Sequence, residues 1–240
     1  MKTLLRADVY RIWRKKRLLL LTLAVMCIAL LMVKTAGEQD ALTVITRVLR
    51  SGTLLLPVMF IPIYLFTWHT DFTSRAVNNV LISGVSRKVY FGSKILLTYM
   101  VGTVLVAAYS LSAILSAYVL LGSFNPEKIM LTIGLQIILY YIVLSLGFMI
   151  YTLVRTTALP TALYLLIVLL GENLLNVLMS QMKMDAGRLS PYLLFQNLSR
   201  VVNIGEFSHA EWTGMIIGGF VIWSVTVGWS WVRFSGEELK

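Results

Sequence analysis

Six stretches of this chain are apolar over about the length that crosses a lipid bilayer, and they constrain its fold more than any motif does. A hydrocarbon core about 30 Å thick takes about 20 residues of helix, and a helix satisfies its own backbone hydrogen bonds there. The six apolar runs are Leu18–Val33, Gly52–Trp68, Ile95–Leu121, Ile129–Val154, Ala158–Leu178 and Trp212–Val232. The chain is 58% hydrophobic and 13% charged, more apolar than one soluble core can bury. The sequence therefore predicts an all-α, polytopic membrane protein, with residues 1–240 forming one transmembrane domain of six helices.

Lys and Arg, 21 in all, are shared unequally between the two sides that six spans create. The segments 1–17 and 71–94, Arg155 and the C-terminal tail would together hold about twice as many as the opposite side. The positive-inside bias then predicts a multi-pass protein of the plasma membrane with both termini in the cytoplasm. The net charge of +10 is explained by topology and attraction to anionic lipids, and nucleic acid is not an expected partner.

The N-terminal segment, residues 1–17, has the pattern of a helix that lies on the membrane surface. Leu5, Val9, Ile12 and Trp13 fall on one helical face, and basic residues surround them. Such a helix places its apolar face at the boundary between headgroups and acyl chains, and we expect a bend near Lys15 to Arg17 before the first span. The alternative is a basic flank that only sets topology.

The segment 71–94, DFTSRAVNNVLISGVSRKVYFGSK, is longer and more basic than a simple connection between two spans requires. It surrounds an amphipathic centre, Ala76 to Ile82, with Arg75, Arg87, Lys88 and Lys94. We expect a docking element at the cytoplasmic face, with a helix over residues 80–90.

The connections on the opposite side are unequal. The loop from Lys34 to Ser51 is short and mixed in charge. The loop over residues 180–211 contains PYLLFQNLSRVVNI, which is too apolar for a free loop and too short to cross the bilayer. It predicts short re-entrant or capping helices between the fifth and sixth spans, because irregular backbone at that depth must be buried in protein.

Glu172 is the one charged residue well inside a predicted span. It lies about 25 Å along the fifth helix, where a carboxylate is costly and usually faces a cavity or a partner. The equal alternative is that the chain turns back at Gly171 to Asn173 and leaves Glu172 near water. Tyr140 and Tyr141 are candidate pathway residues, although the same side chains suit a helix that faces lipid.

The chemistry of a nucleotide or metal enzyme is missing from the sequence. It has no GxxxxGK[ST] loop, and its two His and one Cys do not form a metal-binding pattern. We therefore expect no enzyme activity and no cofactor bound by this chain. An ion-coupled secondary transporter would normally carry several ionisable groups within its spans. It remains an alternative, as does a non-transporting scaffold or sensor subunit.

The phrase LISGVSRKVYFGSKILL, before the third run, resembles a phrase in the permease subunits of type-two ATP-binding-cassette (ABC) transporters. The matching positions are Leu81, Ser83, Ser86, Arg87 and Lys94. The layout of six spans, a basic amphipathic N-terminus and an apolar loop before the last span is also similar. Size and loop pattern look most like the small permeases that export antimicrobial and other amphipathic peptides in Gram-positive bacteria.

This resemblance implies an exporter in which the chain forms half of the translocation path. The segment 71–94 would hold a coupling helix that contacts a dimer of separate ABC ATPase subunits, which would bind ATP and Mg²⁺. A second permease subunit, identical or different, would complete the path. The implied ATPase-coupling residues are Val80, Leu81, Ser83, Gly84, Ser86, Arg87, Lys88 and Tyr90.

Overall fold

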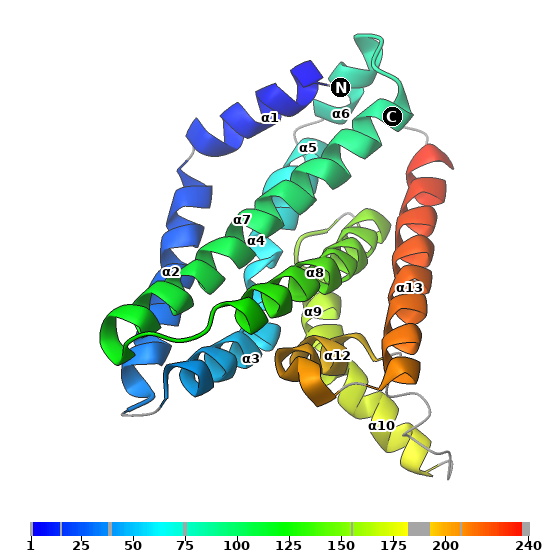
Figure 1. Ribbon diagram of the computed structural model, residues 1–240. Coiled ribbons are helices and arrows are strands. Elements are labelled where there is room, and N and C mark those ends of the chain that lie inside the picture. The colour runs from blue at the N-terminus through cyan, green and yellow to red at the C-terminus, as the bar shows by residue number, and fades with distance from the viewer. Residues whose placement is uncertain are drawn as a thin grey trace.

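The computed structural model is a bundle of long helices (Figure 1). It describes residues 2–14, 16–37, 40–73, 76–154, 156–181, 193–206 and 208–236, and all regular structure in them is helical. Six segments of this described part are long and apolar enough to cross a membrane: Arg17–Thr35, Ala41–Phe72, Arg87–Leu121, Glu127–Leu153, Ala158–Gln181 and His209–Gly236. The predicted all-α fold with six membrane-spanning lengths of helix is confirmed.

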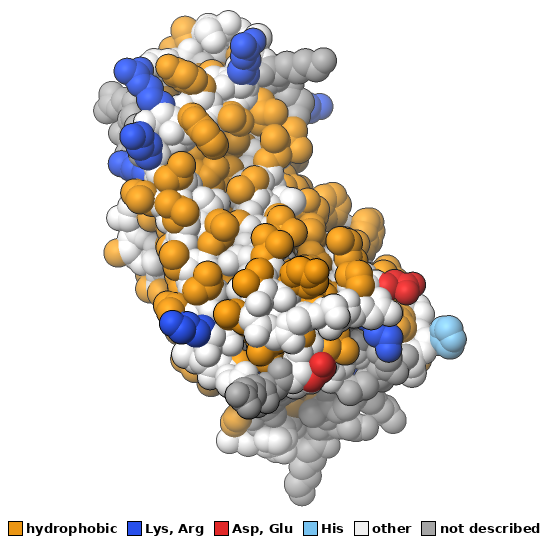
Figure 2. Space-filling model, turned by 60° about the vertical axis from the view of Figure 1, so that its left-hand side comes forward, with side chains coloured by type: hydrophobic (Ala, Val, Ile, Leu, Met, Phe, Trp, Pro, Cys, Tyr) orange, Lys and Arg blue, Asp and Glu red, His pale blue; other side chains and the backbone are white. Residues whose placement is uncertain are grey.

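An apolar surface covers the middle of the molecule. On the face in Figure 2, hydrophobic side chains fill the centre, and Lys and Arg lie toward the two ends. Leu20, Leu115 and Val225, for example, are 64%, 60% and 58% exposed. A soluble protein rarely presents such an area to water, so this belt is the surface that lipid covers.

The two ends of the bundle carry different short helices (Figure 1). At one end lie α1 (Lys2–Arg14), α6 (Ala76–Ile82) and the last turn of α13 (His209–Gly236); we refer to it as the α1 end. At the other lies α12 (Leu194–Arg200), and we refer to it as the α12 end. The first and last described helices therefore begin and finish at the same end.

The N-terminal helix α1 bends sharply into the first span, α2 (Arg17–Thr35). Lys16 at the bend has φ 51°, the left-handed conformation, and this agrees with the bend predicted between Lys15 and Arg17. The predicted apolar face of α1 is divided. Ile12 is buried, whereas Val9 and Trp13 are exposed.

The second span begins earlier than its hydropathy predicted. Helix α3 (Ala41–Met59) starts within the predicted loop Lys34 to Ser51, so the predicted start at Gly52 is wrong. The added turns are amphipathic: Arg47 and Arg50 are exposed, and the opposite face is buried by Ala41, Val44, Ile45, Val48 and Leu49. The mean hydropathy of such a segment is too low to mark it as a span, but the spacing of its apolar residues at the period of a helix does indicate it.

Two of the spans contain a π-helical turn. Phe60, between Pro57 and Pro62, separates α3 from α4 (Ile61–Tyr64), and η1 (Leu65–His69) and α5 (Thr70–Thr73) follow. In the fifth span, η2 (Ile167–Gly171) separates α9 (Ala158–Leu166) from α10 (Glu172–Gln181). Each π turn inserts one extra residue into the helical repeat.

The third span, α7 (Arg87–Leu121), is the longest helix in the described chain. Its predicted start at Ile95 is wrong, since it begins eight residues earlier, where the Ser86 hydroxyl accepts a hydrogen bond from the backbone N–H of Val89. The helix predicted over residues 80–90 is also interrupted. Gly84 has φ 91°, which ends α6 and turns the chain into α7. The fourth span, α8 (Glu127–Leu153), agrees with its prediction to within two residues at each end.

Short helices lie between the fifth and sixth spans, as the apolar loop predicted. Helix α12 and η4 (Val201–Glu206) carry Leu198 and Val201, both fully buried. The amide nitrogen of Gln136 on α8 lies 3.4 Å from the carbonyl oxygen of Leu198 and donates to it. These helices therefore pack against the spans. The part of the predicted loop at 182–192 lies outside the described residues.

Candidate functional site

The segment between the second and third spans forms a folded tip at the α1 end. Val77 on α6 is fully buried, and Val80 and Leu81 pack partly against the core. Ile82, at the end of the same helix, is 84% exposed. Helix α6 is thus anchored on one side and presents an apolar side chain on the other.

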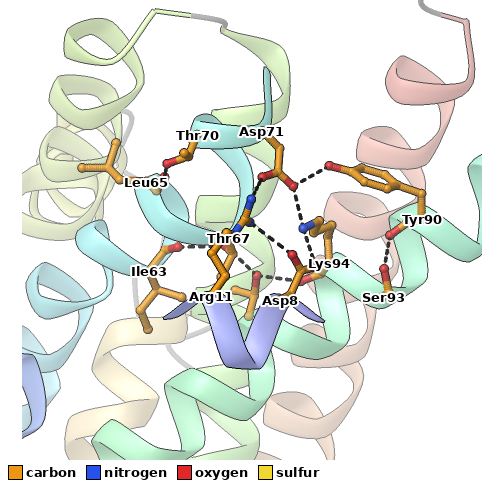
Figure 3. Close-up of polar contacts among 11 residues, drawn as sticks. Asp8, Arg11, Ile63, Leu65, Thr67, Thr70, Asp71, Tyr90, Ser93 and Lys94 are labelled. Atoms are coloured by element: carbon orange, nitrogen blue, oxygen red, sulfur yellow. Dashed lines mark hydrogen bonds and ion pairs between the residues drawn. The ribbon is translucent and has the colours of Figure 1, made fainter. Parts of the chain in front are cut away.

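Four charged side chains meet below this tip, and we call Asp8, Arg11, Asp71 and Lys94 the ion cluster (Figure 3). Lys94 Nζ lies 2.5 Å from Asp8 Oδ2 and 2.6 Å from Asp71 Oδ2. Arg11 Nη1 lies 2.6 Å from Asp71 Oδ1, and Arg11 Nη2 lies 3.2 Å from Asp8 Oδ1. The Tyr90 hydroxyl donates to Asp71 over 2.8 Å. Two acids and two bases balance in charge, and they join α1 to α5 and α7.

The ion cluster is buried deeply enough for its pairing to matter. The Lys94 side chain is 1% exposed, and those of Asp71 and Asp8 are 4% and 9% exposed. Removing one partner from a buried ion pair costs about 3–5 kcal/mol, because the remaining charge has no counterion. Burial alone would lower the pKa of Arg11, but its hydrogen bond to Asp71 and the charges of Asp71 and Asp8 raise that pKa overall. Arg11 therefore remains a permanent counterion.

An aromatic cluster links the ion cluster to the rest of the bundle. Its members are Trp68, Tyr90, Phe91, Phe148 and Phe234. Trp68 of η1 lies 4.5 Å from Phe148 of α8 between ring centroids, and 5.5 Å from Phe234 of α13. Tyr90 stacks on Phe234 at 5.8 Å. If α7 moves at this end, its aromatic side chains therefore push directly on side chains of the second, fourth and sixth spans.

The residues predicted to contact an ATPase fall into two groups. Ser83, Gly84, Ser86 and Lys88 are exposed, and Val80 and Leu81 are half-buried. Arg87 is half-buried, and its guanidinium donates to the carbonyl oxygen of Ser235 at the end of α13. Tyr90 is 1% exposed and lies in the interior with Asp71. Arg87 and Tyr90 thus hold the tip in position, and the exposed surface is formed by the others.

Glu172 has a role that neither sequence interpretation anticipated. The fifth span does not turn back at Gly171 to Asn173, because helix α10 continues to Gln181. The Glu172 carboxylate accepts the backbone N–H groups of Phe195 and Gln196 at 2.6 and 2.8 Å. These are free N–H groups at the start of α12, so Glu172 caps that helix across the loop.

The two tyrosines predicted for a pathway lie in different surroundings. Tyr140 is 1% exposed and meets Phe60 edge to face, with ring centroids 5.7 Å apart. Tyr141 is half-buried, and its hydroxyl lies 2.8 Å from Thr103 Oγ1. Only Tyr141 lies at the surface of the bundle, and it lines a groove between α8 and α13.

Sequence reasoning missed the ion cluster as a site. It placed Lys94 among the basic residues of the docking segment 71–94, and it gave Asp8 no role. One signal was present: Asp8 lies one turn before Ile12, on the side of α1 that packs inward. A charge on the inward-packing side of a helix indicates a buried counterion.

Comparison of the sequence with models of known protein families and with curated proteins found no match.

Proposed function

We propose that this chain is the permease subunit of an ATP-driven exporter in the plasma membrane. In this proposal the segment 71–94 contacts a dimer of separate ATPase subunits that hold ATP and Mg²⁺, and both chain termini lie in the cytoplasm. Two permease subunits, identical or different, form the path. The cargo proposed is an amphipathic or antimicrobial peptide, on the basis of the resemblance in the segment 81–97 and the overall layout.

The observation that carries this proposal is the anchored tip formed by α6. A connection between spans needs no folded helix, yet α6 is held by Val77 on its inner side and presents Ile82 at 84% exposure beyond the spans. An apolar side chain on a pre-organised helix suits a groove in a partner protein, because little ordering cost remains to be met on binding. The contacts within the ion cluster and the aromatic cluster would then transmit movement of the tip to the membrane-spanning helices.

The test is co-expression of the full chain with an ATPase encoded beside it, followed by reconstitution in lipid vesicles. We expect Ile82→Asp to reduce co-purification and ATPase stimulation at least tenfold, and Ile82→Leu to preserve both. Lys88→Glu should weaken the association more mildly. Arg87 is left unchanged because it binds the end of α13, so reversing its charge would also perturb the fold. Equal ATPase binding and stimulation in Ile82→Asp and the unmodified chain would refute the proposal.

Ion-coupled transport is the second candidate, and the buried acids Asp8 and Asp71 are the observation in its favour. Transport in vesicles that lack any ATPase, driven by a proton gradient and stopped by an uncoupler, would support it. Transport that requires ATP and continues after the gradient collapses would exclude it.

A further inference from the structure

A groove between α8 and α13 opens sideways into the apolar belt. The two helices touch at Gly219 and Ile142 and separate toward the α12 end (Figure 1). The cavity between them has a volume of about 430 Å³. It is lined by Leu135, Ile138, Leu139, Tyr141, Ile142, Trp212, Met215, Ile216, Gly219, Phe220 and Trp223. Ile138, Ile216 and Phe220 on its walls are 58%, 64% and 66% exposed, so the groove is open to the surroundings of the bundle.

The groove is about as long as one lipid leaflet is thick. It extends along α13 from Trp212, near the start of the helix, to Trp223. That stretch of helix rises about 16 Å, close to half of a hydrocarbon core about 30 Å thick. Trp212 lies at the α12 end, where a tryptophan suits the headgroup boundary. A chain that entered from that leaflet would reach the middle of the membrane.

The apolar lining of the groove favours a hydrocarbon chain as its occupant. None of the described residues that line the groove carries a charged side chain. The Trp223 indole N–H already donates to the Tyr99 hydroxyl over 2.8 Å, and the Tyr141 hydroxyl already pairs with Thr103. An extended peptide in the groove would bring backbone N–H and C=O groups that require partners in the membrane. An acyl chain brings none.

We propose that this groove binds one acyl chain of a membrane lipid from the leaflet at the α12 end. Tyr141, stacked on Tyr99 with ring centroids 5.0 Å apart, forms the inner end wall. Gly219 lets the two helices meet at the floor of the groove, since a Cβ there would come within 2.7 Å of the Ile142 Cδ1 atom. The inference depends on the membrane fold alone and holds whether or not the chain couples to an ATPase.

The test uses the purified full chain in nanodiscs that contain phosphatidylglycerol with a diazirine near the end of one acyl chain. After illumination, lipid adducts are mapped by mass spectrometry. Leu20 and Leu31 of α2, which are 64% and 56% exposed, provide the reference for ordinary lipid contact. We expect saturable labelling of residues 135–142 and 212–223, at least tenfold above that of α2. Labelling that only follows exposure on every helix would overturn the proposal.

A matched pair of variants locates the bound chain. Ile216→Trp fills the groove, and Ile217→Trp places the same bulk one residue away, outside the lining. Both positions are exposed, so both variants should fold with unchanged thermal unfolding. We expect Ile216→Trp to reduce groove labelling at least fivefold and Ile217→Trp to leave it unchanged. Equal labelling in the two variants, or displacement of the probe by an apolar helical peptide but not by unlabelled lipid, would overturn the proposal.

Discussion

Lys94 carries its charge into the interior because two carboxylates meet it there. Its partners Asp8 and Asp71 are 86 and 23 residues away in sequence, and Asp8 belongs to a different helix at the N-terminus. Hydropathy places Lys94 just outside an apolar run, and no local pattern shows which acids it will contact. The pairing depends on how α1 folds back over α7, so the sequence alone could not predict it.

Removing the charge of Lys94 should destabilise the protein, because the buried carboxylates of its partners would lose a counterion. We expect Lys94→Met to lower the free energy of unfolding by about 3–5 kcal/mol, because Asp8 and Asp71 would then share only Arg11. The double variant Lys94→Met with Asp8→Asn restores the charge balance and should recover part of that loss. Thermal unfolding of the purified protein in detergent measures both. A double variant that is no more stable than Lys94→Met would show that shape, and not charge, sets the cost.

At the scale of elements, hydropathy located all six spans but not all of their ends. The fourth span was predicted closely because it is apolar on every side. The second began too late in the prediction, because α3 buries only one face and keeps Arg47 and Arg50 on the other. The break in the predicted coupling helix follows from Gly84, whose positive φ suits a glycine and ends α6.

Glu172 determines how firmly α12 is held. Glu172→Leu removes both acceptors from the start of that helix, while Glu172→Gln keeps one neutral acceptor oxygen. Loss of a helix cap costs about 0.5–2 kcal/mol, so we expect faster amide hydrogen exchange over residues 194–200 in Glu172→Leu. Glu172→Gln should lie between that variant and the unmodified chain. Unchanged exchange in Glu172→Leu would mean that packing alone holds α12.

Gly147 allows α8 to approach the second span closely. A Cβ at this position would overlap the ring of Tyr64, which is fully buried and stacks on Tyr151 at 5.0 Å between ring centroids. We expect Gly147→Ala to destabilise the protein by about 1–3 kcal/mol through overpacking. Gly134→Ala on the same helix meets no atom within 4 Å and should be neutral or slightly stabilising. Thermal unfolding separates the two variants, and equal midpoints would refute the close approach.

At the scale of the whole molecule, the first described helix begins and the last one finishes at the α1 end, and the membrane should separate that end from the loop between α7 and α8. We test this with single cysteines at Ser86 and Ser123, both exposed, in a chain with Cys27→Ala. An impermeant maleimide should label Ser123→Cys in intact cells and Ser86→Cys only after permeabilisation. The bias of Lys and Arg toward the α1 end gives this direction. Labelling of both positions in intact cells would contradict a six-span topology.

Helix α7 also gives the molecule a lever. It runs from the tip at Arg87 to Leu121 without a proline or a π turn, a rise of about 52 Å, whereas the second and fifth spans are interrupted. A rod of this kind transmits rotation without bending, so a tilt of about 10° about one end would move the other by about 9 Å. A rotation imposed at the Arg87 end would therefore displace the Leu121 end of the helix as a rigid unit. The interrupted second and fifth spans could bend to accommodate this displacement.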